Sequence, residues 1–231
     1  MHEYIAENLA QLNAEIQSAC QSAARTRDSV RLIAVSKTYS AELAQAAINA
    51  GCLDLAENRV QEITEKLPRL SGNFDMHLIG HLQSNKVRKA VGAAKYIHSV
   101  DRLSIIEKIN NVGEELGITT NILVQVNTSL EDSKSGCEIE ETVQLCEIAA
   151  GAKYAKFCGL MTIGPLAGDI SLVEKSFETL ANLGEKVKAL CENGKCELSM
   201  GMSSDFALAI KYGATMIRVG TRIFGPRDYD K

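Results

Sequence analysis

One apolar run in the chain ends in a lysine. Residues 32–37 read LIAVSK, so Lys37 closes a segment with the composition of a buried β-strand. A lysine in that position is costly unless it is paired, neutral or used covalently. A desolvated amine with a depressed pKa is the nucleophile that forms Schiff bases with carbonyl compounds. Lys37 is therefore a candidate nucleophile, although a side chain that reaches solvent at a strand end is consistent with the same run.

Two serines stand where a later strand-like run passes into a helical pattern. The segment 201–205 (GMSSD) leads directly into the helical pattern DFALAIKYG. Backbone N–H groups at the start of a helix favour an anion, and the hydroxyls of Ser203 and Ser204 add donors. Either serine is equally suited to cap the helix. The segment thus predicts an oxyanion site or a helix N-cap.

The last strand-like run is followed by a second set of donors. It ends in Arg218, Val219 and Gly220, and Thr221 comes next. Gly220 would let the backbone approach a ligand closely, and Thr221 offers a hydroxyl. If the chain folds as a (β/α)₈ barrel, the loops after strands 7 and 8 are the recurrent phosphate site. A carbonyl-reactive lysine opposite such a site indicates a phosphorylated aldehyde as the ligand.

Positioning these residues requires a regular alternation of strands and helices. Eight short runs of β-branched and aliphatic residues have strand patterns, at 32–37, 53–58, 77–80, 96–101, 121–127, 157–164, 197–201 and 216–220. Helical patterns lie between them, at 41–50, 59–67, 85–93, 104–116, 139–149, 172–191 and 205–211. Strict βα alternation with eight units predicts an α/β fold, a parallel sheet closed into a (β/α)₈ TIM barrel. A doubly wound open sheet is the alternative, but its GxGxxG fingerprint is absent from the sequence.

In such a barrel, ligands bind at the carboxyl ends of the strands. The residues that end six of the runs are mostly polar, and we expect them to line one mouth: Ser36, Lys37, Glu57, Asn58, Ser99, Asp101, Asn127, Thr128, Met200, Gly201 and 218–220.

Length and composition fit one domain. The chain has 231 residues, 45% of them hydrophobic and 23% charged, and no Pro-rich or Ser-rich linker interrupts it. Apolar residues at spacings of three and four over 4–25 predict a leading helix. We expect a single TIM-barrel domain over 1–231, with the leading helix within 1–28 and the barrel over 29–231.

Charge and cysteine usage exclude several classes of protein. The net charge is −4 and the basic residues are dispersed, which argues against nucleic-acid or anionic-membrane partners. No run approaches the roughly 20 apolar residues of a membrane span, and the N-terminus is not signal-like, so we expect a cytoplasmic protein. Seven cysteines without a CxxC pair indicate reduced thiols rather than a disulfide framework or a zinc site, and we expect no metal.

Motifs along almost the whole chain resemble those of one family. The sequence contains, in order, LIAVSKT (32–38), AENRVQE (56–62), HLIGHLQSNK (77–86), SVDR (99–102), ILVQVNTS (122–129), SKSG (133–136), GLMTIG (159–164), LSMGMSSDFALAI (198–210) and IRVGTRIFGPRDY (217–229). They closely resemble the YggS/PROSC family of pyridoxal phosphate homeostasis proteins. The barrel of that family is related to that of fold-type III enzymes such as alanine racemase.

The resemblance implies a cofactor, pyridoxal 5′-phosphate (PLP), and a role for each matching residue. The implied residues are Lys37 for the covalent aldimine, Asn58 near the ring, and Ser203, Ser204, Gly220 and Thr221 at the phosphate. Arg218 matches the arginine that faces the pyridine nitrogen in this fold type. A guanidinium only donates hydrogen bonds, so a ring nitrogen facing it must stay unprotonated. Such a ring is a weaker electron sink, which suits holding the cofactor or modest proton chemistry better than deep carbanion stabilisation.

The implied function is a reversible carrier of PLP in intracellular PLP homeostasis, which would supply apoenzymes and have no catalytic turnover. The alternative is a PLP-dependent amino-acid racemase, which needs two acid/base groups on opposite faces of the substrate. Lys37 would be one of them, but the usual partner is a tyrosine from a separate β domain, for which 231 residues leave no room. That domain is also the usual dimerisation element, so we expect a monomer. A Schiff-base aldolase, the third hypothesis, leaves Arg218 without a role.

Overall fold

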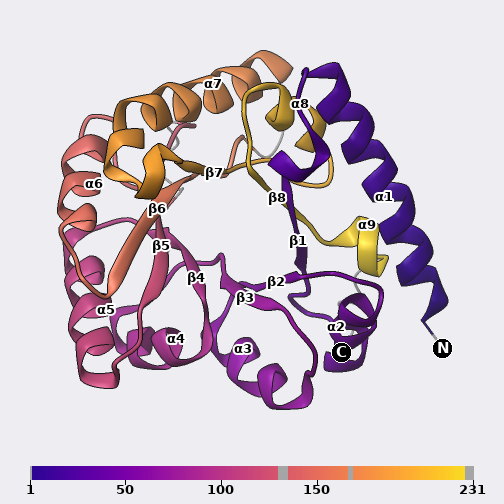
Figure 1. Ribbon diagram of the computed structural model, residues 1–231, viewed down its shortest axis with the longest axis horizontal. Helices are drawn as coiled ribbons and strands as arrows, with labels where there is room; N and C mark the ends of the chain where they lie inside the picture. The colour runs from indigo at the N-terminus through magenta and orange to yellow at the C-terminus, as the bar shows by residue number, and fades with distance from the viewer. Residues whose placement is uncertain (1, 130–134, 166–168, 227–231) are drawn as a thin grey trace.

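The strands form a closed ring. The computed structural model describes residues 2–129, 135–165 and 169–226. Within them, parallel strands follow one another around a barrel, and β8 pairs with β1 to close it (Figure 1). The strands are β1 (Arg31–Val35), β2 (Asp54–Glu57), β3 (Asp75–Leu78), β4 (Tyr96–Val100), β5 (Thr120–Gln125), β6 (Ala155–Met161), β7 (Glu197–Ser199) and β8 (Met216–Val219). The predicted (β/α)₈ barrel is confirmed, and the open-sheet alternative is wrong because the β1–β8 pairing leaves no edge strand.

Helices surround this ring of strands (Figure 1). They are α1 (Glu3–Ser22), α2 (Ala41–Asn49), α3 (Val60–Lys66), α4 (Val87–Ala93), α5 (Leu103–Leu116), α6 (Thr142–Ala150), α7 (Ile170–Val187), α8 (Phe206–Lys211) and α9 (Thr221–Phe224). Short 3₁₀ helices cover Arg27–Ser29, Leu67–Arg69, Ser84–Lys86, Lys188–Leu190 and Glu192–Gly194. The helical patterns of the sequence correspond to α1–α8. The single turn α9 was not predicted, because four residues are too few to show a periodicity.

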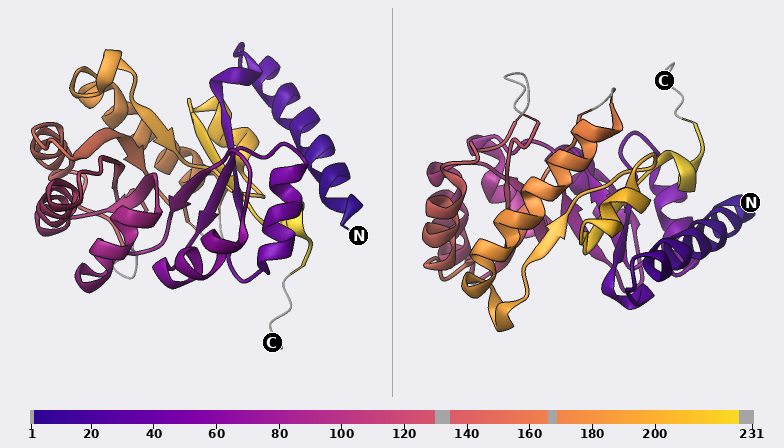
Figure 2. Two further views of the ribbon diagram at one scale, coloured as in Figure 1. Left: turned by 60° about the horizontal axis from the view of Figure 1, so that its bottom comes forward. Right: turned by 90° about the horizontal axis from the view of Figure 1, so that it is seen from above.

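The leading helix lies outside the ring and packs against α2, α8 and α9 (Figures 1 and 2). One face of α1 is buried, and it consists of Ile5, Leu9, Leu12, Ile16 and Cys20. Asn8 Nδ2 donates a hydrogen bond to the carbonyl oxygen of Ile223 at 3.0 Å, and Glu15 pairs with Arg222. The leading helix therefore anchors α9, the turn that directly follows the last strand.

The barrel interior contains both apolar and polar side chains. One buried cluster consists of Ile33, Val35, Ala56, Leu123, Met161 and Met216. Four polar residues, none more than 4% exposed, lie in the same interior: His77, His98, Ser199 and Arg218. The hydrogen bond between His98 of β4 and Ser199 of β7 joins two strands that are not neighbours, so it crosses the barrel. His77 is fully buried, and its Nε2 lies 2.9 Å from Asp54 Oδ1.

All seven cysteines carry free thiols. Within the described ranges, no helix is both long enough and apolar enough to cross a bilayer. Over the same ranges, no three His, Cys, Asp or Glu side chains gather in a way that could hold a metal ion.

Candidate functional site

A cavity of about 390 Å³ opens at the carboxyl ends of the strands. Its wall contains most of the residues singled out from the sequence, namely Lys37, Asn58, Ser203, Arg218, Gly220 and Thr221. Ser204 does not belong to the wall, and it is exposed. The barrel thus brings the ends of β1, β2 and β8 and the segment after β7 to one place.

Lys37 lies just beyond the end of β1, in a tight turn. The backbone stays extended through Ser36, whose N–H donates to the carbonyl oxygen of Ala56 at 3.0 Å. The N–H of Tyr39 then donates back to the Ser36 carbonyl at 3.1 Å. Thr38 between them has a φ of +68°, in the left-handed region that costs a residue with a side chain roughly 1–2 kcal/mol. The chain accepts this strain directly after the half-buried lysine, as backbones at functional sites often do.

Arg218 forms the buried side of the cavity. Its Nη1 donates to Ser199 Oγ at 2.6 Å, and its Nη2 donates to the carbonyl oxygen of Thr162 at 2.8 Å. Burial lowers the pKa of the guanidinium to about 10, with the charge of Asp205 acting in the opposite direction, so the group stays charged at neutral pH. Among the described residues, no carboxylate lies within ion-pair distance of it. A buried cation held only by neutral acceptors is suited to bind an acceptor atom of a ligand.

Hydroxyl and backbone donors gather at another part of the wall. Thr221 is the first residue of α9. The N–H groups of Ile223 and Phe224 donate to the carbonyl oxygen of Gly220, so the donors left at the start of this turn are those of Thr221 and Arg222. Ser203 lies in the turn between β7 and α8, whose N-cap is Asp205. Neither serine therefore caps the helix, and Ser203 lies at the cavity wall instead. This donor set fits an anion such as a phosphate.

Eight wall residues were missed by the sequence reasoning: Val35, Ile79, Gly80, His81, Gln125, Ser135, Ile163 and Met202. The signal for Ile79 was available, because side chains alternate along a strand and Ile79 stands two residues after the inward-facing His77. Gln125 Nε2 donates to the carbonyl oxygen of Ser135 at 2.8 Å, which ties the SKSG motif to the wall. The first two residues of that motif, Ser133 and Lys134, and residues 227–229 of the last motif lie outside the described residues.

Gly80 brings the ends of β2 and β3 together. A Cβ atom at this position would lie 2.3 Å from the carbonyl oxygen of Asn58, closer than any real contact. Ser99 Oγ donates to the carbonyl oxygen of Gly80 at 2.6 Å from the next strand. Ser99 thus supports the wall from behind, and Gly80 allows Asn58 to stand in it.

Some polar strand ends face away from the cavity, contrary to expectation. Ser36 Oγ donates to Glu57 Oε1 at 2.7 Å, and Lys66 Nζ of α3 donates to the same oxygen at 2.7 Å. All three residues are buried between the barrel and its helices. The expectation that Ser36 and Glu57 line the mouth is therefore wrong. Each precedes an inward-facing residue, Lys37 or Asn58, and successive side chains point to opposite faces.

The residues that follow β4 and β5 also differ in whether they face the cavity or the helices. Thr128 Oγ1 lies 2.6 Å from Ser176 Oγ of α7, so it faces the helices and does not line the mouth. Asp101 lies close to the wall, because its Oδ2 is 3.5 Å from Nδ1 of the wall residue His81. Its other oxygen accepts a hydrogen bond from Arg102 Nη1 at 2.6 Å.

Comparison with known proteins identifies the family. Residues 8–228 match the family model of the alanine racemase N-terminal domain. The pyridoxal phosphate homeostasis protein of Pasteurella multocida is 37% identical over 231 residues, covering 98% of this chain and 99% of the relative. That of Synechocystis is 43% identical over 201 residues, covering 86% and 92%. The chain belongs to the family of pyridoxal phosphate homeostasis proteins.

Solved structures agree with this family assignment. PipY of Synechococcus elongatus, solved with PLP bound, is 35% identical with a TM-score of 0.82, covering 96% of this chain and 100% of PipY. A protein of unknown function from Bifidobacterium adolescentis is 36% identical with a TM-score of 0.90, covering 95% of this chain and 94% of that one. Alanine racemase of Clostridium difficile, at 17% identity and a TM-score of 0.78, shares the fold with 99% of this chain over 58% of its own length.

Proposed function

We propose that this protein binds pyridoxal 5′-phosphate in the cavity and acts as a reversible carrier in PLP homeostasis. The names of its relatives and the PLP-bound structure of PipY support this role. The observation that carries the proposal is Arg218, a buried cation without a contacting carboxylate among the described residues, on the wall that also holds Lys37.

The cavity residues fit each part of the cofactor. PLP supplies a reactive aldehyde, a pyridine ring whose nitrogen accepts a hydrogen bond, and a phosphate. Lys37 offers the amine for the aldehyde, and Arg218 offers the donor for the ring nitrogen. The hydroxyls of Ser203 and Thr221, with the first turn of α9, offer donors for the phosphate.

The chemistry of Arg218 disfavours reactions that need a strongly stabilised carbanion. A guanidinium donates and does not accept, so it keeps a facing ring nitrogen unprotonated. Without a proton on that nitrogen, the ring withdraws electrons weakly and a carbanion gains little stabilisation. The wall therefore suits a carrier or modest proton chemistry better than a reaction that depends on a stabilised carbanion.

Borohydride reduction tests the site. We expect purified protein incubated with PLP to turn yellow and to carry, after reduction, one added pyridoxyl phosphate group on Lys37 in peptide mass spectra. Lys37→Ala should lose the adduct, and Lys211→Ala, a change of an exposed lysine on α8, should keep it. An adduct on another lysine, or no adduct, would contradict the proposal.

One observation favours the racemase alternative. His81 lines the same cavity as Lys37, and its Nδ1 lies 3.5 Å from Asp101 Oδ2, so a second proton-exchanging group is present. Chiral analysis of L-amino acids after incubation separates the two functions. A carrier gives no racemisation above that of Lys37→Ala. Racemisation at an ordinary enzyme rate that His81→Ala abolishes would establish an enzyme.

The proposal extends to partners and location. A carrier would deliver PLP to apoenzymes, which predicts that the loaded protein reactivates a PLP-dependent apo-aminotransferase with Lys37 as the donor site. We also propose a monomer, which light scattering would report at 25.0 kDa. The free thiols fit the reducing cytoplasm, where we propose that the protein acts.

A further inference from the structure

A continuous chain of hydrogen bonds crosses the barrel interior below the cavity. Arg218 Nη1 donates to Ser199 Oγ at 2.6 Å, and Ser199 Oγ lies 2.9 Å from His98 Nδ1. His98 Nε2 lies 2.8 Å from His77 Nδ1. His77 Nε2 in turn lies 2.9 Å from Asp54 Oδ1. The chain thus joins the cavity wall to the opposite, N-terminal mouth of the barrel.

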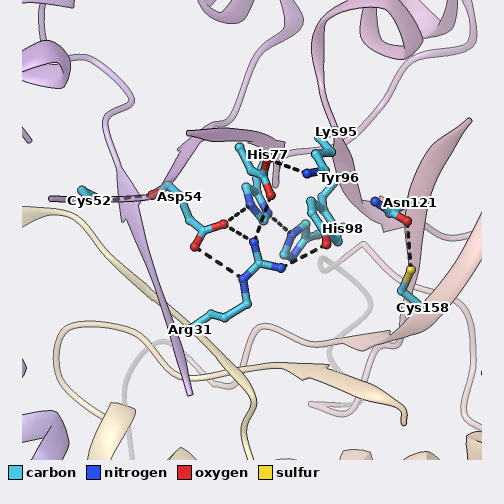
Figure 3. Close-up of polar contacts among 10 residues, drawn as sticks. Arg31, Cys52, Asp54, His77, Lys95, Tyr96, His98, Asn121 and Cys158 are labelled. Atoms are coloured by element: carbon cyan, nitrogen blue, oxygen red, sulfur yellow. Dashed lines mark hydrogen bonds and ion pairs between the residues drawn. The ribbon is translucent and has the colours of Figure 1, made fainter. Parts of the chain in front are cut away.

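The Asp54 end of this chain is a fixed acceptor. Burial disfavours the ionised carboxylate, but the hydrogen bonds and charges of His77 and Arg31 outweigh it and lower the pKa of Asp54. Arg31 also donates to Tyr96 Oη at 3.0 Å, and the ring of Tyr96 is stacked on that of His77 with centroids 4.6 Å apart (Figure 3). An ionised carboxylate only accepts, so the proton between His77 and Asp54 belongs to His77 Nε2.

Both histidines are held neutral. Burial lowers the pKa of His77 and outweighs the opposing effect of Asp54, and burial lowers the pKa of His98 well below its usual value, with the positive charge of Arg218 adding to the effect. A neutral imidazole has one N–H and one bare nitrogen. His77 uses its N–H toward Asp54, so its Nδ1 accepts from His98 Nε2. His98 Nδ1 then carries no hydrogen and accepts a hydrogen bond from the hydroxyl of Ser199.

Every bond in the chain therefore points from Arg218 toward Asp54. The hydroxyl of Ser199 donates its hydrogen bond to His98. Its oxygen lone pairs therefore remain to accept a hydrogen bond from Arg218, which can only donate. The aligned dipoles turn their negative ends toward the guanidinium and stabilise its charge in the absence of a contacting carboxylate among the described residues. The bonds at the two ends are fixed because Arg218 only donates and Asp54 only accepts, and the direction of the two bonds between them follows from the neutral state of His77.

We propose that Ser199, His98 and His77 are positioning residues that hold Arg218 in one orientation by a one-way hydrogen-bond chain set by Asp54 at the far mouth of the barrel. The effect of this chain on PLP rests on the proposed function, in which Arg218 faces the ring nitrogen. The direction of the chain itself does not, and it is measurable without cofactor.

Nitrogen NMR of protein labelled in its four histidines tests the direction. At about pH 8, above the ordinary histidine pKa, we expect His77 and His98 to be neutral with the proton on Nε2 in both. His2 and His81 stand outside the chain and serve as internal references. A protonated imidazole, or a proton on Nδ1 in either residue of the pair, would overturn the proposal.

Asp54→Asn tests whether the chain acts as a unit. An amide no longer fixes the proton of His77, so the tautomer populations of both His77 and His98 should change, although His98 does not touch Asp54. A change confined to His77 would show that the contacts are independent and would overturn the proposal.

Ser199→Ala tests the effect on the site and serves if Asp54→Asn does not fold. Loss of the hydroxyl next to Arg218 should weaken PLP binding at least tenfold, about 1.4 kcal/mol, and change the absorbance of bound PLP. Thr120→Val is the matched control, because Thr120 Oγ1 is buried in β5 without a partner among the described residues. PLP bound equally well and with unchanged absorbance by Ser199→Ala would overturn the positioning role. Failure of the wild type to bind PLP would instead contradict the proposed function and leave the tautomers as the test of the chain.

Discussion

Lys66 Nζ lies 2.7 Å from the carbonyl oxygen of Ser36, the residue that immediately precedes Lys37. The same ammonium lies 2.7 Å from Glu57 Oε1. The other oxygen of this carboxyl and Oε2 of Glu62 are both buried, and neither has a hydrogen-bond partner among the described residues. Lys66 and Glu57 thus support the Lys37 turn from behind.

Glu57 makes the stability of the fold depend on pH. Burial raises the pKa of Glu57 to about 7, with Glu62 adding to the rise and Lys66 opposing it. A carboxyl whose pKa is raised on folding stabilises the fold fully below its unfolded pKa, and that stability is lost as the pH rises through about 7. Between about pH 4.5 and pH 7, the free energy of unfolding of the wild type should therefore fall by up to about 3 kcal/mol. Glu57→Gln should not show this loss, and urea unfolding across this pH range measures both proteins.

The control for this change is Glu42→Gln. Glu42 forms an exposed ion pair with Arg69, so its replacement should alter the free energy of unfolding by less than about 1 kcal/mol. Its pH profile should run parallel to that of the wild type above about pH 5. If Glu57→Gln also runs parallel to the wild type, Glu57 does not titrate in the folded protein near neutral pH.

Lys66→Met tests the support of the Lys37 turn. The change removes the donor to the Ser36 carbonyl and leaves a buried carboxyl without its cation, which should cost about 3–5 kcal/mol of unfolding free energy. Because the turn then loosens, PLP should also be retained more weakly. Lys211→Met removes an exposed pair with Glu174 and should cost less than about 1 kcal/mol. Equal effects of the two changes would show that burial of the Lys66 pair is unimportant.

The sequence predicts the barrel because its signals are local. Alternating runs and helical periods lie within single segments, and eight such units lead to closure without any knowledge of long-range contacts. The positions at strand ends likewise predict Lys37, Asn58 and Arg218 as wall residues, because a parallel barrel gathers all carboxyl ends at one mouth.

The features that the sequence does not show are the direction in which a side chain faces and the contacts between residues far apart in the chain. Ser36 and Glu57 stand beside wall residues but point to the helices, and only the register of the strands decides which neighbour faces inward. The bond between His98 and Ser199 joins residues 101 positions apart across the barrel. No spacing rule of the sequence leads to such a contact, so the interior chain became visible only in the folded structure.

Gly80→Ala should damage the cavity without unfolding the barrel. Its Cβ would lie 2.3 Å from the Asn58 carbonyl oxygen, so the ends of β2 and β3 must move apart and Asn58 leaves its place in the wall. We expect PLP affinity to fall about tenfold or more, measured by absorbance titration. Gly92→Ala is the matched control, because nothing lies within 4 Å of a Cβ in α4, and it should stabilise the helix by about 0.5–1 kcal/mol. Unchanged affinity in Gly80→Ala would show that Asn58 is not needed in the wall.

Arg218→Glu reverses the hydrogen-bonding character of the buried wall. The carboxylate accepts where the guanidinium donates, so a facing ring nitrogen should gain a proton and the absorbance of bound PLP should shift. Because burying a carboxylate near Ser199 and Thr162 is costly for the fold, Arg218→Gln is the second variant. Its neutral amide should produce a smaller shift in the same direction. Arg222→Gln, a change outside the wall that removes only the pair with Glu15, should leave the spectrum unaltered. A spectrum that stays the same in both Arg218 variants would mean that the guanidinium does not face the ring.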